Sequence, residues 1–136
     1  MNTAIPLQQL STEYSPEERF ALARLMCALF NQWTLSLPEQ ATLLGLSAKS
    51  RATLHGMHKG DKPLPDGRDV LDRAGHLLGI AKSLGLLFPE NPEIIAAWMK
   101  GRQPALENEA PLEIIEKHGL LGLAWLRNYL DFLRGQ

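Results

Sequence analysis

Apolar side chains recur every three or four residues along most of the chain, which is the spacing of amphipathic helices. The first such run follows the segment SPEE, where Ser15 can cap a helix, Pro16 can occupy its first position and Glu18 can complete a capping box. The apolar positions of this helix are Leu22, Leu25, Met26, Leu29, Phe30 and Trp33. No segment alternates apolar and polar residues with the period of a strand. The pattern therefore predicts an all-α fold.

Two shorter helices are expected to follow, within the segment LSLPEQATLLGLSAKSRATLHGMHKG. Ser36 is a possible cap of the first helix. Gly45 is expected to end that helix, because glycine adopts the left-handed conformation easily. Ser47 can cap the second helix, which we expect to run to about Gly56 or Gly60.

A loop and a long helix come next. Residues 60–68 have the composition of a loop, and either Asp66 or Asp69 is expected to open the helix after it. Small and apolar residues then alternate by four and three at Val70, Ala74, Leu77, Ala81 and Leu84. Two heptads are too few for a free coiled coil, so we favour a packed helix that bridges two parts of the fold. Shorter helices are expected after a cap at Asn91 and before Gly119, and an apolar helix closes the chain.

The segment around Gly45 has the three features that a DNA-binding helix-turn-helix requires. Ala41 is a small residue on the first helix, Gly45 makes the turn, and the apolar residues suited to pack the two helices are Leu44, Leu46 and Leu54. The candidate DNA-contacting residues are Ser47, Lys49, Ser50, Arg51, Thr53 and Lys59, whose side chains can reach phosphates or base edges. Two features depart from the pattern: Arg51 stands where a buried aliphatic residue is usual, and Gly56 is expected to interrupt the second helix. By itself the segment fits a DNA reader and a corner of a helical bundle equally well.

Composition and charge narrow the choice of partners. The chain has 136 residues, of which 45% are hydrophobic, and its formal net charge is −1. Such a chain is no polycation, so any DNA contact must come from a local basic patch and would benefit from dimerisation. Its single cysteine, Cys27, excludes an intrachain disulfide and favours a reducing, cytoplasmic setting. Residues 1–14 have the polarity of a loose arm without the features of a signal peptide, and no apolar stretch is long enough to span a bilayer.

The last third of the chain, WMKGRQPALENEAPLEIIEKHGLLGLAWLRNYLDFLRG, resembles the toxin-binding domain of the MbcA/ParS/Xre antitoxins. The residues that carry this resemblance are Trp98, Pro104, Pro111, Leu112, Gly119, Leu130, Arg134 and Gly135. Upstream, WTLSLPEQATLLGLS is similar to the Xre-like N-terminal domain of the same family, and the resemblance extends over residues 33–135. The chain departs from the family at Gln103, where asparagine is common, and at Glu107 and Asn108, where a glycine pair is usual.

The resemblance implies an antitoxin that blocks a toxin encoded beside it, commonly a RES-type enzyme that consumes NAD, and that represses its own operon. It implies a DNA-binding unit over residues 1–66 and a linking helix with a toxin-binding unit over residues 67–136, assembled as a homodimer or a larger complex with the toxin. The family places the chain end near the toxin active site, which corresponds to Arg134, Gly135 and Gln136. Independently, the apolar set of the last helix is wider than one buried stripe, so that part of it is expected to meet another chain. The residues selected on this ground are Trp125, Tyr129, Phe132 and Leu133.

We find no pattern typical of catalysis. The chain has no glycine-rich phosphate loop, and His55 and His58 have no third ligand at a suitable spacing for zinc. We therefore expect no enzyme activity, cofactor or metal. An acidic run, made of Glu107, Glu109, Glu113 and Glu116, either compensates a helix dipole or attracts basic residues of a toxin. The alternatives to an antitoxin are a stand-alone transcriptional regulator with a dimerising C-terminal region, and an interaction adaptor with a degenerate helix-turn-helix.

Overall fold

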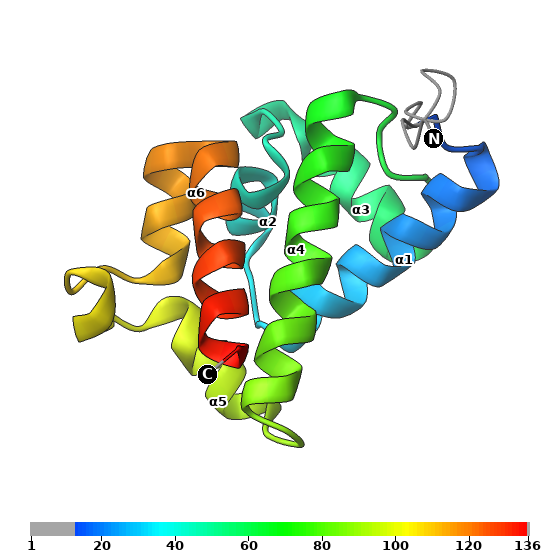
Figure 1. Ribbon diagram of the computed structural model, residues 1–136. Coiled ribbons are helices and arrows are strands. Elements are labelled where there is room, and N and C mark those ends of the chain that lie inside the picture. Colours follow the sequence, from blue (N-terminus) through cyan, green and yellow to red (C-terminus); the bar gives the residue numbers. More distant parts are fainter. Residues whose placement is uncertain (1–12, 136) are drawn as a thin grey trace, which may run out of the picture.

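A computed structural model describes residues 13–135, and in this part of the chain every regular element is a helix (Figure 1). The prediction of an all-α fold is confirmed. The elements are α1 (Pro16–Gln32), α2 (Leu37–Leu44), η2 (Ala48–Ser50), α3 (Arg51–Lys59), α4 (Arg68–Leu87), α5 (Pro92–Lys100), η3 (Pro104–Leu106) and α6 (Pro111–Arg134). The arm expected over residues 1–14 lies outside the described residues except for its last two.

Reciprocal capping boxes start the first two helices. The Ser15 hydroxyl accepts a hydrogen bond from the backbone N–H of Glu18 at 3.1 Å, and the Glu18 carboxylate accepts one from the Ser15 N–H at 2.9 Å. Ser36 and Glu39 repeat the arrangement at the start of α2, with distances of 3.3 and 2.8 Å. Each box satisfies two backbone groups that a helix N-terminus leaves unpaired. Both predicted caps are confirmed, and Glu39 completes a box that was not predicted.

The turn after α2 takes the expected form. Gly45 has a φ of 68°, in the left-handed region, and its N–H together with that of Leu46 returns to carbonyls of the last turn of α2. This closes the helix in the manner predicted. The interruption expected at Gly56 is wrong, because α3 continues through this residue to Lys59. Gly56 is instead buried under the methylenes of Lys62, which occupy the space that a β-carbon would need.

Three predicted caps differ in the structure. Ser47 caps the short η2 turn, where its hydroxyl accepts from the N–H of Lys49 at 3.3 Å, and α3 begins only at Arg51. Neither Asp66 nor Asp69 caps α4, which begins at Arg68 with no side-chain cap. Asn91 holds the N-cap position of α5, but its side chain forms no capping hydrogen bond. Packing against the core stabilises these helices, so that a side-chain cap at each start is dispensable.

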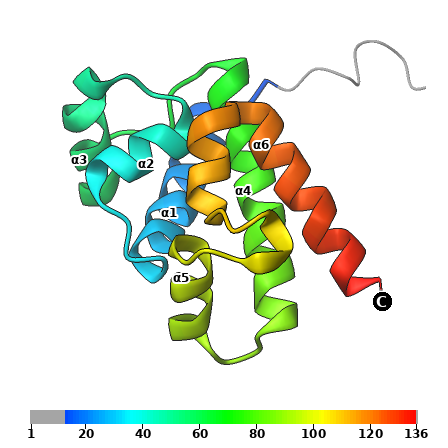
Figure 2. The same cartoon turned by 90° about the vertical axis from the view of Figure 1, so that its left-hand side faces the viewer.

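The helices α4 and α6 form the most extensive helix pair among the described residues and lie side by side in Figure 1, whereas Figure 2 shows the C-terminal end of α6 at the edge of the molecule. A single hydrophobic cluster fills the space between them and the other helices, and every α-helix contributes buried residues to it. The predicted seam of α4 is confirmed for Val70, Ala74, Leu77 and Leu84, which are buried, whereas Ala81 is half-buried. This core contains residues from both sides of position 66, so the two proposed units share it and their division remains a prediction.

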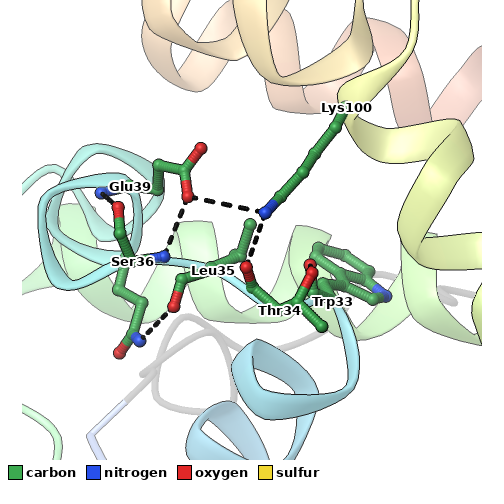
Figure 3. Close-up of polar contacts among 7 residues, drawn as sticks. Trp33, Thr34, Leu35, Ser36, Glu39 and Lys100 are labelled. Atoms are coloured by element: carbon green, nitrogen blue, oxygen red, sulfur yellow. Dashed lines mark hydrogen bonds and ion pairs between the residues drawn. The ribbon is translucent and has the colours of Figure 1, made fainter.

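Lys100, the last residue of α5, fastens that helix to the connection between α1 and α2 (Figure 3). Its ammonium group donates a hydrogen bond to the carbonyl of Thr34 and lies 3.9 Å from the carboxylate of Glu39. Thr34 has a φ of 53°, a left-handed conformation that is uncommon for a threonine. The Lys100 contact therefore connects the second half of the chain to a strained turn in the first half.

The helix α6 is bent at Gly119, where φ is 58° and ψ is −131°. The residue divides α6 into the short helix predicted before Gly119 and the apolar helix predicted after it. Only glycine adopts this combination of angles without a large steric penalty. None of the helices over residues 13–135 has the length and apolar character needed to cross a membrane.

Candidate functional site

The helices α2 and α3 meet through the turn at Gly45 and cross over a shared apolar contact. Ala41, Leu44 and Leu54 are buried between them, and Leu46 is half-buried against the same cluster. These are the residues that the sequence pattern predicted to pack the two helices together. A small residue at position 41 lets the two backbones approach, as the sequence pattern predicted.

The basic side chains of this region point away from the core. Lys49, Arg51 and Lys59 are exposed, and Ser50 and Thr53 are half-buried beside them. Ser47 is also exposed, and its hydroxyl lies 3.5 Å from that of Ser50. All six candidate DNA-contacting residues therefore belong to one segment, made of η2, the residue before it and α3.

The fold accommodates the charge of Arg51, at a position where an aliphatic residue is usual, by leaving it in solvent. Arg51 is the first residue of α3 and is exposed to solvent, so its guanidinium is not buried. Beside it, a pocket of about 390 Å³ opens between α2 and α3. The pocket is lined by Leu37, Pro38, Ala41, Ser47, Arg51 and Leu54. An aliphatic side chain buried at position 51 would fill this part of the crossing between α2 and α3 more completely than the exposed Arg51 does.

A polar contact fixes α3 against α2 on the other side of the crossing. Gln40, which is 3% exposed, donates from its amide nitrogen to the carbonyl of Leu35 at 3.0 Å. Its amide oxygen lies 2.8 Å from Nε2 of His58 and must accept a hydrogen bond from it, because the amide nitrogen is directed at Leu35. Burial, and then the charge of His55, lower the pKa of His58. The structure therefore favours a neutral His58 with its proton on Nε2.

Arg73 of α4 is the residue that sequence reasoning missed. Its Nε donates to the Asp69 carboxylate at 3.0 Å, and its Nη1 lies 3.4 Å from the Thr42 carbonyl at the end of α2. A β-carbon on Gly45 would come within 2.6 Å of this guanidinium, and one on Gly119 within 3.3 Å. One side chain is thus packed between the turn that joins α2 to α3 and the bend in α6. Nothing in the sequence indicates this contact, because the three residues are far apart in the chain.

The second half of α6 has two apolar faces. Its inner face, formed by Leu123, Leu126 and Leu130, is completely buried. Its outer stripe consists of Leu121, Trp125 and Phe132, which are 80%, 50% and 64% exposed. Large apolar groups are rarely exposed together in this way unless they form a binding surface.

The candidate toxin-binding residues are distributed unevenly over these faces. Trp125 and Phe132 belong to the outer stripe, and the ring of Tyr129 stacks on that of Trp125 with centroids 5.6 Å apart. Leu133 is half-buried and packs against the core, while Arg134 and Gly135 are exposed at the chain end. Gln136 lies outside the described residues. Leu121 was not selected, although its spacing of four residues from Trp125 places both on one helical face.

Close packing against α4 holds this outer stripe in place. Gly79 of α4 lies under the side chain of Arg127, and a β-carbon at position 79 would come within 2.4 Å of its Nε. Nη1 of Arg127 also lies 3.5 Å from Nδ1 of His76, and burial, followed by the charge of Arg127, lowers the pKa of that histidine. One turn further along, the Ser83 hydroxyl donates to the Asp131 carboxylate at 3.3 Å. These contacts hold the second half of α6, which carries the stripe, against α4.

The turn between α5 and α6 contains two residues with left-handed backbones, Glu107 with a φ of 56° and Asn108 with a φ of 62°. The side-chain amide of Gln103 holds the start of this turn through the carbonyls of Trp98 and Gly101. Position 107 in particular is strained, because glutamate, unlike asparagine, is seldom found at positive φ. Positions 107 and 108, where the family that the sequence resembles usually carries a glycine pair, are thus the two positions of this turn with a left-handed backbone.

The helix α3 and the C-terminal end of α6 lie on opposite sides of the molecule, as Figure 2 shows. A partner bound at the C-terminal end of α6 would therefore leave α3 accessible. Among the residues that the structure describes, no three histidine, cysteine or acidic side chains gather closely enough to hold a metal ion.

Comparison with known proteins identifies a relative that is similar over most of its length. No family model matches the chain. An uncharacterized protein called y4oB, from Sinorhizobium fredii (strain NBRC 101917 / NGR234), is 29% identical to it over 105 residues. The aligned region covers 77% of this chain and 78% of y4oB. The name of this relative describes no activity.

Proposed function

We propose that this protein is an antitoxin of a type II toxin–antitoxin system, of the MbcA/ParS/Xre kind. It binds and neutralises a cognate toxin, of the RES type that consumes NAD, and it represses its own operon by binding operator DNA as a homodimer. The observation that carries the proposal is the outer stripe of α6, a surface of large exposed apolar side chains that extends toward the C-terminal end of α6, on the side opposite the basic helix α3. Exposed aromatic anchors of this kind are typical of protein interfaces.

The turn between α5 and α6 supports the assignment to this family. Glu107 and Asn108 adopt left-handed conformations, and the family usually carries glycines at these two positions. A backbone that retains this shape without the glycines is what a relative with a substituted turn would have. The bend at Gly119 supports the same assignment, because it separates the two helices that the family motif contains.

DNA binding is the proposed role of α2 and α3, arranged as a helix-turn-helix. Arg51 is exposed at the first position of α3 and Lys49 is exposed in the η2 turn just before it, at the end of the helix that enters the major groove in such proteins. Ser47, Ser50, Thr53 and Lys59 complete the proposed contact surface. The near-neutral chain makes this local patch and dimerisation necessary for useful affinity.

The test of neutralisation is co-expression with the neighbouring open reading frame. The toxin should arrest growth alone and be harmless with this chain, and the two proteins should purify together. Phe132→Asp should abolish rescue without lowering the melting temperature, because the side chain is mostly exposed. Leu25→Asp is the matched control, since Leu25 is similarly exposed on α1 and should not affect rescue. A neighbouring product that is harmless alone, or that does not purify with this chain, contradicts the antitoxin proposal.

The role of the chain end requires a separate test. Deleting residues 133–136 should release toxin activity and leave DNA binding intact. Retained neutralisation would show that the inhibitor is another part of the surface. The stand-alone regulator makes a different prediction: the outer stripe would be covered by a second copy, so that Phe132→Asp would convert a dimer into a monomer and weaken DNA binding.

DNA binding is tested by gel-shift titration on the fragment upstream of the gene. Lys49→Ala combined with Arg51→Ala should weaken binding. The slope of the logarithm of the binding constant against the logarithm of the salt concentration should become shallower by about 0.9 for each phosphate that the variant no longer neutralises. Lys82→Ala combined with Arg102→Ala is the matched control, because it removes the same charge from exposed positions outside α3. Equal effects of the two pairs would mean that net charge, and not α3, determines the affinity.

A further inference from the structure

A groove opens between the turn that follows α5 and the helix α6, next to the exposed face of Trp125. It has a volume of about 400 Å³. Its lining includes Leu106, Glu107, Glu109, Ile114, Leu121 and Trp125. Leu106 and Ile114 are buried and supply an apolar floor, whereas Leu121 and Trp125 belong to the outer stripe. The groove is therefore an extension of the surface proposed to bind the toxin.

The rim of the groove carries negative charge. Glu107 is exposed, and its carboxylate forms no ion pair or hydrogen bond with the residues that the structure describes. Glu109 is paired with Lys117, which lowers the pKa of the Glu109 carboxyl and keeps it ionised. With the charge of Glu109 balanced by its partner, Glu107 is the carboxylate on this rim that a bound group can use, and the exposed His118 lines the same groove.

This combination of surfaces selects for one kind of side chain. An apolar floor accommodates an aliphatic stem, a carboxylate at the rim attracts a cation, and the indole of Trp125 attracts the flat face of a guanidinium. A phosphate or carboxylate group would be repelled by Glu107, and a wholly apolar anchor would remove water from its carboxylate without replacing the lost interactions. Arginine fits better than lysine, because its planar fork can pair with a carboxylate through two hydrogen bonds while it stacks on an aromatic ring.

We propose that this groove binds an arginine side chain of the partner protein. The aliphatic stem lies along Leu106 and Ile114, and the guanidinium pairs with Glu107 and stacks on Trp125. The inference rests on the proposed function in taking the toxin as the partner, and it goes further by naming the chemistry that the partner must present. Glu107, one member of the acidic run in the sequence, thereby gains a specific role.

A model ligand tests the groove without the partner. The full-length ¹⁵N-labelled protein is titrated with N-acetylarginine N-methylamide and followed by NMR, and N-acetylcitrulline N-methylamide serves as a neutral isostere. We expect shifts at residues 105–109 and at the indole N–H of Trp125, with the citrulline compound about tenfold weaker because it cannot form charge-assisted hydrogen bonds. N-acetyllysine N-methylamide, titrated in the same way, should also bind more weakly than the arginine compound. Equal binding of the arginine and citrulline compounds, equal binding of the arginine and lysine compounds, or shifts elsewhere on the surface would overturn the proposal.

Two matched variants locate the interaction. Glu107→Gln should reduce arginine binding to the level of the citrulline compound and leave the melting temperature unchanged, because the side chain is exposed. Glu116→Gln removes an exposed carboxylate from α6 that lines a different pocket, beside Pro38, and should leave binding unchanged. If the two variants behave alike, the groove does not recognise arginine through Glu107.

The result can be separated from that of the proposed function. If the toxin is neutralised but the arginine compound does not bind, the groove proposal fails and the antitoxin proposal stands. If the compound binds in the groove but no toxin is neutralised, the antitoxin proposal fails and the arginine site stands. In a complex with the toxin, Glu107→Arg should weaken association at least tenfold, whereas Glu116→Arg should not.

Discussion

Replacing Gly45 by alanine perturbs the turn between α2 and α3 in two ways that the structure separates. The first is backbone strain, because Gly45 has a φ of 68° and a left-handed conformation costs an ordinary residue about 1–2 kcal/mol. The second is a collision, because the new β-carbon would come within 2.6 Å of the Arg73 guanidinium and 2.8 Å of the Asp69 carboxylate paired with it. Moving Arg73 away would break its interactions with Asp69 and the Thr42 carbonyl, together worth about 1 kcal/mol at this partly exposed position.

The expected decrease in the free energy of unfolding is therefore about 2–3 kcal/mol, less a few tenths for the reduced entropy of the unfolded chain. Urea unfolding followed by circular dichroism measures it, and the midpoint should fall by about 1 M at an unchanged slope. Gly60→Ala is the matched control, because Gly60 also has a positive φ, of 82°, but nothing lies within 4 Å of the added carbon. That variant should show only the effect of backbone strain, about 1 kcal/mol.

A double-mutant cycle isolates the collision. In an Arg73→Ala background, Gly45→Ala should be no more destabilising than Gly60→Ala, because the guanidinium is absent and the Asp69 carboxylate, no longer paired with it, can turn away from the new β-carbon. If Gly45→Ala and Gly60→Ala are equally destabilising in the unmodified protein, Arg73 does not pack on Gly45 as described. Backbone strain alone would then account for the effect of both substitutions.

The remaining predictions concern the turn, the histidines and the contact between α5 and the α1–α2 connection. Glu107→Gly should raise the free energy of unfolding by about 0.5–1 kcal/mol in urea titrations, because it relieves a left-handed backbone, whereas Glu107→Ala should not. The folded state lowers the pKa values of His58 and His76 below the unfolded value of about 6.5, so stability should be complete above that pH and fall on acidification. The slope of stability against pH below about 6.5 should be smaller in His58→Gln; an unchanged slope would exclude His58 as a contributor. Lys100→Met should lower the melting temperature by a few degrees, because it removes the hydrogen bond from Lys100 to the Thr34 carbonyl. An unchanged melting temperature would show that this bond contributes nothing to stability.

Local signals in the sequence predicted the helices well where a single residue type determines the backbone. Ser15 and Ser36 could be identified as caps because the capping hydrogen bonds connect residues only three apart. Gly45 and Gly119 could be identified as breaks because only glycine adopts their backbone angles freely. The same rule wrongly predicted that Gly56 would interrupt α3, because a glycine inside a helix can also allow close packing, here against Lys62.

The candidate site was only partly predictable for a related reason. The basic character of α3 and the excess of apolar residues on α6 are properties of short segments, and both are visible in the sequence. Which of those residues are exposed depends on the helix that packs against each face, so Leu133 was grouped with Trp125 although it packs against the core. Leu121 was omitted, although the helical spacing that connects it to Trp125 could have identified it.

The order of amino acids is enough to establish that the chain is helical, where most helices begin and end, and which segments carry positive charge or surplus apolar surface. Those features depend on interactions between residues a few positions apart, which the sequence specifies directly. The folded molecule alone establishes that Arg73 lies between Gly45 and Gly119, that Glu107 forms the rim of an apolar groove, and that α3 and the C-terminal end of α6 are at opposite sides. These arrangements join residues distant in the chain, and they exist only once α4 and α6 pack together and bring the rest of the molecule into register around one core.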